Sequence, residues 1–335
     1  MSGPCLFYRV AALRCAEYLQ ASAGLLDSVA GPQALPALGV FGLTGESALL
    51  GRHQRASSAI RLEEARRRGI FALRRQTGGR TLSPGEGTVA VALALPAPGA
   101  LTGEALPVAR LVNRAVRGVL AAGAILGAPC YYFGRDTLSQ SSRPVGYVSF
   151  EAREGGASLV EVFLSVERPV GLAQELDGYP PRQEAATPAE VTFAQALGRA
   201  LSFDALSAAL HAGFERAFGL RLEDGGALPL GALLPAEEGE EGLARSGVAE
   251  VAIGFVEALV ARRDNRIVRA RVRGDFLCPS KVIRSLEQAV EGQPLELASL
   301  GAAIDRVFKE PLAALVGVRD LRVFAEALLA AGQSP

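Results

Sequence analysis

The chain has 335 residues, of which 49% are hydrophobic and 21% are charged, so we expect a globular protein of about two domains with a sizeable core. Its formal net charge is zero, which argues against a protein that coats nucleic acid. The longest apolar tract, near residues 89–101, is interrupted by Pro96 and Pro98. It is too short to span a bilayer, so we expect no membrane segment.

The cysteines and histidines do not have the spacing of a metal-binding site. Four cysteines are scattered along the chain without a close pair, at Cys5, Cys15, Cys130 and Cys278. That spacing is typical of reduced thiols and does not match a zinc site. With only two histidines, we predict no metal centre built from histidine. The N-terminal residues lack the basic start and apolar run of a signal peptide, so we expect a cytoplasmic protein.

The first hundred residues predict a helix among several strands. Residues 11–30 carry apolar side chains at roughly helical spacing, and a proline at position 32 is expected to end this helix. Short apolar runs predict the strands. These lie near residues 6–10, 38–41, 47–50, 70–73 and 88–95.

A loop with three arginines and two glycines lies between the last two of these strands. It reads Arg74-Arg75-Gln76-Thr77-Gly78-Gly79-Arg80. Adjacent glycines let a backbone approach a ligand closely, and arginine offers forked donors that suit phosphate or carboxylate. We therefore expect an anion site here, to which Arg52 contributes. The alternative is a hairpin whose arginines are solvated.

The middle of the chain predicts helices around a hairpin. Residues 106–126 have the apolar spacing of a long helix that Gly127 ends. Strands follow at 147–151 and 158–166, with glycines at the turn between them. Residues 192–218 again predict helices.

Composition places a domain boundary late in the chain. Residues 222–247 hold two glycine-rich segments and an acidic run at 237–241, which together predict a linker. We therefore expect a first domain over 1–221 and a second over 248–335.

The second domain is predicted to begin with two strands and to end with helices. In the strand at 266–272, apolar residues alternate with Arg269, Arg271 and Arg273, so one face should be basic. This face is expected either to dock an acidic partner or to be simply solvated. Helices are predicted near residues 280–290, 297–308, 311–315 and 319–331.

Four segments, taken in order, resemble successive motifs of the lipoate–protein ligase family. They are Leu50-Gly51-Arg52-His53-Gln54, Arg74-Arg75-Gln76-Thr77-Gly78-Gly79, Gly134-Arg135-Asp136-Thr137-Leu138 and Pro144-Val145-Gly146. The tail from Arg266 is similar to that family's accessory domain, so the resemblance covers most of the chain. It implies an α/β (α+β) fold of the class II synthetase and biotin-ligase type, with a mixed sheet flanked by helices and a small α+β C-terminal domain.

The resemblance also implies an activity. Such a ligase activates lipoate, or a similar acid such as octanoate, with ATP and Mg²⁺. It then passes the acyl group to a lysine on the lipoyl carrier domain of a 2-oxoacid dehydrogenase or a glycine-cleavage protein. The substrate- and nucleotide-binding residues implied in this chain are Arg74, Arg75, Thr77, Gly78, Gly79, Arg80, Arg135, Asp136, Thr137 and Gly146.

The chain departs from the family pattern at three places. Arg80 stands where a third glycine is usual, and Pro84-Gly85 stands where a His-Asp pair is usual. The family's essential lysine falls on Arg143, or on Pro144 if the match slips by one. Arginine keeps the positive charge but does not readily deprotonate. The only lysines are Lys281 and Lys309, so no lysine of the first domain can replace it.

Cys130 suggests a second mechanism of acyl transfer. Related octanoyltransferases carry the acyl group on a cysteine upstream of the family lysine, and Cys130 has a loosely similar place. A nucleophilic thiolate needs a lowered pKa, which nearby cations such as Arg135 or Arg143 could provide. Three hypotheses follow: a divergent lipoate ligase, a cysteine-dependent acyltransferase of the same fold, and a non-catalytic protein that binds an acyl group, a nucleotide or a partner.

Overall fold

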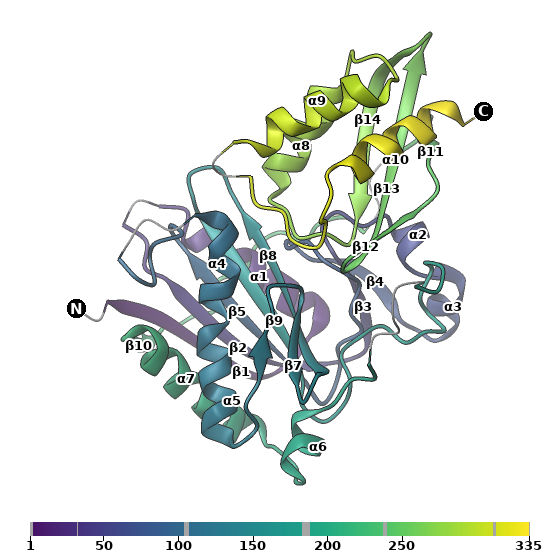
Figure 1. The fold of residues 1–335 in the computed structure, drawn as a ribbon. Coiled ribbons are helices and arrows are strands. Elements are labelled where there is room, and N and C mark those ends of the chain that lie inside the picture. Colours follow the sequence, from purple (N-terminus) through teal and green to yellow (C-terminus); the bar gives the residue numbers. More distant parts are fainter. Residues whose placement is uncertain are drawn as a thin grey trace.

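A computed structural model describes residues 3–31, 33–103, 107–182, 188–236, 240–310 and 313–334. The proline at 32, residues 237–239 of the acidic run and the first two residues of the helix expected at 311–315 therefore lie outside the described residues. Figure 1 shows a large domain with a smaller one beside it, formed by the end of the chain.

The large domain is built on a mixed sheet, as the sequence predicts. Within the described residues this sheet has eight strands. β1 pairs in parallel with β10 and with β2, and the other neighbours are antiparallel. In spatial order the strands are β10 (Arg221–Asp224), β1 (Pro4–Arg14), β2 (Ala37–Thr44), β5 (Thr88–Leu95), β9 (Ser158–Ser165), β8 (Arg143–Ala152), β7 (Thr137–Gln140) and β6 (Tyr131–Tyr132).

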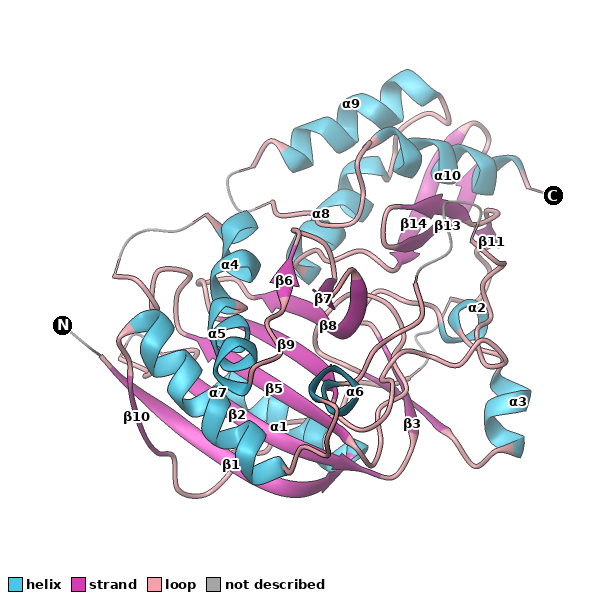
Figure 2. Cartoon of the chain, turned by 60° about the horizontal axis from the view of Figure 1, so that its bottom comes forward, coloured by secondary structure: helices cyan, strands magenta, loops and turns pink. Residues whose placement is uncertain are grey.

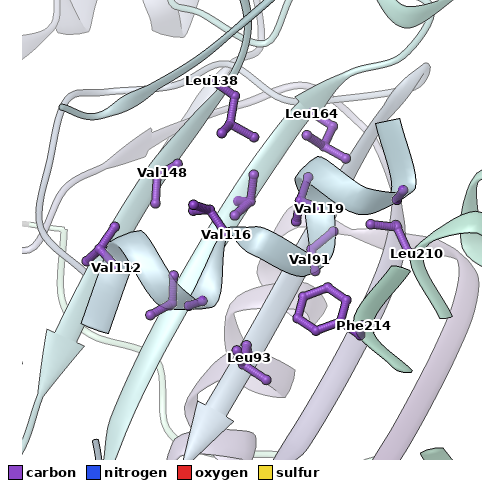
Figure 3. Close-up of a cluster of buried hydrophobic side chains, with 14 of the residues drawn as sticks. Val91, Leu93, Val112, Val116, Val119, Leu138, Val148, Leu164, Leu210 and Phe214 are labelled. Atoms are coloured by element: carbon purple, nitrogen blue, oxygen red, sulfur yellow. The ribbon is translucent and has the colours of Figure 1, made fainter. Parts of the chain in front are cut away.

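Helices cover both faces of this sheet, which is why its central strands are apolar on both sides. One face carries α4 (Val108–Ala115), α5 (Arg117–Leu126) and α7 (Phe203–Phe218), and α1 (Cys15–Ser28) lies on the other. Figure 3 shows Val119 and Phe214 of this helical layer packed over Val91 of β5.

The helices differ in detail from those expected. α1 begins at Cys15 because β1 continues to Arg14. The long helix predicted over 106–126 is divided at Val116 into α4 and α5. In 192–218 a short α6 (Phe193–Leu197) precedes α7. Sequence signals fix both ends of α7, because the Ser202 hydroxyl accepts from the N–H of Ala205 and Gly219 ends the helix with a φ of 62°.

The second domain has its own core. Strands β12 (Ala249–Val251), β13 (Gly254–Arg263) and β14 (Arg266–Gly274) form its sheet with the short β11 (Ala244–Arg245). Helices α8 (Ser280–Val290), α9 (Leu297–Phe308) and α10 (Arg322–Gln333) pack on that sheet. This small α+β unit has the architecture that the resemblance implies.

The arginines of β14 are not a free basic face. Arg273 is only 6% exposed, and it pairs with Glu240 at 2.7 Å and with Glu287 at 3.2 Å. Arg271 pairs with the same Glu287 at 3.4 Å. Val268, expected on the apolar face, is instead 54% exposed.

The segment expected to be a linker is partly structured. Residues 222–224 belong to β10, so the sheet extends beyond the predicted boundary at 221. The chain then packs against α1, where the N–H of Gly231 donates to the carbonyl of Gln20 at 2.7 Å. No helix among the described residues has the length and apolarity needed to cross a membrane.

Four smaller elements lie beside the main sheet in the large domain. β3 (Ser47–Leu50) and β4 (Phe71–Arg74) form a parallel two-stranded sheet. The short helices α2 (Ala56–Ala59) and α3 (Leu62–Arg67) lie between them in the chain. The loop that follows β4 is the arginine-glycine loop noted in the sequence.

We predict that the close crossing of α5 and α7 makes Gly213 essential for stability. A Cβ added at Gly213 would lie 2.4 Å from the carbonyl oxygen of Gly118, too close for any real contact. Gly213→Ala must therefore push the helices apart, at a cost of about 1–3 kcal/mol. In α9 the same change, Gly301→Ala, places its Cβ in open space and should stabilise by about 0.5–1 kcal/mol.

Urea denaturation of both variants measures this difference. Equal stabilities for Gly213→Ala and Gly301→Ala would contradict the crossing described here.

Candidate functional site

The loop 74–80 lies between β8 and the second domain, and backbone hydrogen bonds hold it on both sides. The N–H of Gly78 donates to the carbonyl of Phe150 at 3.2 Å, and the N–H of Gly79 donates to that of Phe276 at 3.1 Å. A Cβ on Gly78 would lie 2.8 Å from the Phe276 oxygen. The glycines therefore let the second domain come directly against the loop.

His53 strengthens the same contact. Its Nε2 lies 2.8 Å from the carbonyl oxygen of Cys278, so this nitrogen carries the proton of a neutral ring. The ring stacks on Phe276 with centroids 5.3 Å apart. The backbone carbonyl of His53 accepts a hydrogen bond from the N–H of Gly274 at 3.0 Å. Burial lowers the pKa of His53 to about 3.

Arg74 and Arg75 fix the backbone around the loop. Arg74 donates through Nη1 to three carbonyls of residues 51–54, at 2.6–3.0 Å, and through Nε to that of Pro235 at 3.0 Å. Arg75 donates to the carbonyls of residues 49, 78 and 80 at 2.9–3.2 Å. Burial lowers the pKa of Arg75, and its guanidinium lies 5.3 Å from the centre of the Phe163 ring.

A buried polar network fills the space between the loop and the sheet. The Thr77 hydroxyl bonds to Glu161 and lies 2.9 Å from the Ser149 hydroxyl oxygen. The Tyr18 hydroxyl donates to the same Glu161 at 2.5 Å. Sequence reasoning missed Glu161, although a lone carboxylate within the apolar run 158–165 could have revealed it, because a buried charge needs partners.

Arg80 and Asp136, which the resemblance places at the nucleotide site, form an ion pair with each other. Arg80 Nε donates to Asp136 Oδ2 at 2.5 Å, and Nη2 donates to the carbonyl of Ile253 at 3.0 Å. The guanidinium also lies 5.1 Å from the centre of the Tyr147 ring. Asp136 is 2% exposed. Arg80 thus ties the two domains together beside the loop.

The remaining motif residues lie nearby in different surroundings. Arg135 is exposed, and its carbonyl accepts from the Tyr132 hydroxyl at 2.6 Å. Thr137 is half-buried opposite Tyr147 in the β7–β8 pair. Gly146 is in β8, where an added Cβ would lie 2.6 Å from a neighbouring carbonyl oxygen of β9. Only Asp136 of this group bonds directly to the loop.

A cavity of about 700 Å³ adjoins Arg80. We call it the Arg80 cavity. Its main polar and aromatic lining residues are Gln54, Arg80, Tyr147, Asp177, Tyr179 and Asp275. Tyr179 is 8% exposed and stacks on Phe255 with centroids 4.8 Å apart. Its buried hydroxyl has no hydrogen-bond partner within the described residues.

Asp275 is a fully buried carboxyl on the wall of the Arg80 cavity. It accepts from Gln54 Nε2 at 2.5 Å and from the N–H of Phe255 at 3.0 Å. Burial raises the pKa of Asp275 to about 7, although Arg80 acts in the opposite direction. The cavity therefore contains a carboxyl that titrates near neutral pH.

The two predicted catalytic residues lie outside this cavity. Arg143 is exposed at the start of β8 and donates to the carbonyls of Ala189 and Glu190 at 2.9 and 2.6 Å. Cys130 is 6% exposed within the core on the α5 face of the sheet. Burial raises the pKa of Cys130 to about 12, so the lowered pKa required of a thiolate nucleophile is absent.

The described carboxylates do not form a metal site. Asp136, expected near Mg²⁺, is engaged by Arg80. No group of three or more His, Cys, Asp or Glu side chains in the described parts of the chain could hold a metal ion. A Mg²⁺ ion that accompanies ATP usually takes one or two carboxylates together with the phosphates, so Asp136 could contribute to such a site only after it leaves Arg80.

No protein-family model matches the sequence, and no curated protein matches it. Solved structures do match. LipL1 of P. falciparum in complex with lipoate has a TM-score of 0.66 at 11% identity, over 97% of each chain. A bipartite lipoate protein ligase of Thermoplasma acidophilum, described with its E2 lipoyl domain, has a TM-score of 0.54 at 15% identity, over 67% of this chain and 86% of that one.

A third structure, lipoate-protein ligase A bound with ATP, has a TM-score of 0.50 at 14% identity, over 67% of this chain and 88% of that one. At such identities the likeness establishes the architecture, and the match to LipL1 includes both domains because it extends over nearly the whole chain. The resemblance noted in the sequence is thereby confirmed at the level of fold: the chain has the fold of the lipoate–protein ligases.

Proposed function

We propose that this chain is a cytoplasmic lipoate–protein ligase-like protein. It binds lipoate, or a similar acid such as octanoate, together with ATP, and passes the acyl group to a lysine of a lipoyl carrier domain. That carrier would belong to a 2-oxoacid dehydrogenase or a glycine-cleavage protein. The similar structures support this choice, since one contains lipoate, another contains ATP and a third is described with an E2 lipoyl domain.

The Arg80 cavity is the observation that carries the proposal. Its volume of about 700 Å³ lies in the range of small-molecule sites. Tyr179 lines this cavity, and its hydroxyl is buried without a partner within the described residues, which costs free energy. An acceptor oxygen on a bound acyl acid or nucleotide would satisfy this hydroxyl once the Tyr179 side chain turns it toward the cavity.

The chemistry would proceed in two transfers. A carboxylate oxygen of the acid attacks the α-phosphorus of ATP, and pyrophosphate leaves. The carrier amine then attacks the acyl carbonyl and releases AMP. Negative charge on the phosphate needs fixed positive donors, and Arg61, Arg80 and Arg182 line the cavity. Arg80 and Arg182 can serve in this way only after they exchange their carboxylate partners, Asp136 and Glu250, for the ligand.

Binding without turnover is the second candidate. The arginines of the loop already hold protein oxygens, and neither lysine belongs to the first domain. The cysteine route has less support, because the Cys130 thiol would remain protonated near neutral pH.

We predict that the protein binds lipoate and ATP but forms the acyl-adenylate slowly. A missing contact to developing charge typically costs roughly a hundred- to a thousand-fold in rate. Calorimetry measures binding, while mass spectrometry detects the adenylate and the acylated lipoyl domain. Cys130→Ala should change neither result. Binding without any adenylate would select the second candidate, whereas no binding of either ligand would refute the proposal.

We predict that Tyr179→Phe lowers the affinity for the ligand without lowering the stability of the fold. The change removes a hydroxyl that has no partner, so the free energy of unfolding should stay equal or rise by up to about 1 kcal/mol. Affinity for the ligand should fall by roughly three- to tenfold. Tyr132→Phe, which removes a hydroxyl outside the cavity, is the matched control. Equal affinity in both variants would show that Tyr179 does not contact the ligand.

We predict that anion binding in the Arg80 cavity weakens as pH rises through about 7. Asp275 titrates near that value, and its ionised form would repel a carboxylate or phosphate beside it. Its neighbour Asp177 adds repulsion, while Arg80 opposes it. Lipoate affinity should fall about tenfold between pH 6 and pH 8.

Titration calorimetry across this range tests the effect. Asp275→Asn should flatten the pH dependence, and the exposed Asp305→Asn should leave it intact. A pH dependence that survives Asp275→Asn would place its cause elsewhere.

A further inference from the structure

We propose that a second interdomain cavity, separate from the Arg80 cavity, binds a small anion that carries phosphate or carboxylate groups. This cavity has a volume of about 550 Å³, and we call it the Arg52 cavity. The large domain contributes Arg52, Gln76 and Glu151, and α8 contributes Ser280, Lys281 and Arg284. A smaller space of about 210 Å³ shares Arg52, Ser280 and Arg284 with it.

The acidic residues of the Arg52 cavity already have partners. Asp27 pairs with Arg153 and Glu154 pairs with Lys281, both at 2.6 Å. Glu151 accepts from the Ser280 N–H at 2.9 Å and from its hydroxyl at 2.6 Å. These contacts account for every carboxylate that lines the larger cavity.

The four cations that line the larger cavity, Arg52, Arg153, Lys281 and Arg284, outnumber its three carboxylates by one. The side chain of Arg52 donates to the neutral amide oxygen of Gln76 at 3.0 Å. Neither Arg52 nor Arg284 has a carboxylate within ion-pair distance among the described residues. In the smaller space, Arg271 and Arg273 both pair with Glu287, and Arg273 also pairs with Glu240. A concave surface with such a surplus attracts anions, and guanidinium groups match phosphate and carboxylate geometry.

The site is built from side chains of both domains. The first N–H of α8 is occupied by Glu151, so the end of that helix is not what offers the donors. Arg52 follows β3 in the large domain, while Arg284 lies on α8 in the second. An anion between them would therefore bridge the two domains.

The arrangement favours a small ligand over the surface of a partner protein. Arg284 and Lys281 are exposed, but Arg52 is half-buried and lines both spaces. A compact anion can reach all three cations, whereas a broad acidic surface would meet only the exposed two. The Arg52 cavity shares no lining residue with the Arg80 cavity, so this inference is independent of the proposed function.

Calorimetry with inorganic pyrophosphate at low ionic strength, where screening is weak, tests the site on the full chain. Wild-type protein should show saturable binding. Arg52→Gln and Arg284→Gln should each weaken it by about tenfold or more, since each removes charge-assisted hydrogen bonds. Arg110→Gln and Arg199→Gln change exposed arginines outside both cavities and should leave the affinity unchanged.

Several results would overturn the proposal. One is the absence of saturable pyrophosphate binding, and another is an equal loss of affinity in the two control variants. A third is binding of an isolated lipoyl domain through Arg284 without any binding of pyrophosphate. If Arg52→Gln shifts the melting temperature, Arg284→Glu still gives a clear answer, because this exposed charge reversal should abolish binding. Tyr179→Phe should leave pyrophosphate binding intact, so failure of the lipoate proposal would be recognised separately.

Discussion

The docking of residues 274–280 on His53 and the loop 74–80 is the contact on which the arrangement of the molecule depends. Three hydrogen bonds define it, from Gly79 to Phe276, from His53 to Cys278 and from Gly274 to His53. The two cavities adjoin different parts of this segment, because Asp275 lines one and Ser280 lines the other. Along β8, Tyr147 and Glu151 likewise line one cavity each, while Ser149 between them meets Thr77. A single strand face therefore connects the two cavities.

The arginines of the loop show why a sequence motif alone does not determine whether its residues bind a ligand or stabilise the fold. A guanidinium group presents forked donors, and these suit a phosphate and a pair of backbone carbonyls equally well. Arg74 bonds carbonyls of residues 51–54, and Arg75 bonds the carbonyl of Leu49 in β3 and carbonyls of the loop itself. Arg80 instead meets a carboxylate, Asp136, and remains beside a cavity. The same residue type thus serves structure at two positions and borders the candidate site at a third.

Much of the fold could be predicted from the sequence, because the strongest signals were local. The apolar run of β5, the glycine turn before β9 and the caps of α7 each act within a few residues. The errors concern contacts between distant segments. The pairing of β10 with β1 turned part of a predicted linker into sheet. The core around Cys130 raised the pKa of a candidate nucleophile, and Tyr179 came to the cavity from a loop without any recognisable motif.

His53 gives the docked arrangement a built-in sensitivity to acid. The ring is neutral where its Nε2–H meets the Cys278 carbonyl, and its pKa falls from an ordinary 6.5 to about 3 because burial disfavours the imidazolium. The stabilisation from this residue is complete above pH 6.5 and declines as the pH falls toward 3, since only the undocked state takes up the proton readily. Asp275 in the same docked segment acts in the opposite direction, because burial raises its pKa to about 7 and the cost of its buried charge is relieved as the pH falls below that value. The two titrations therefore offset much of each other at the joint between the two domains.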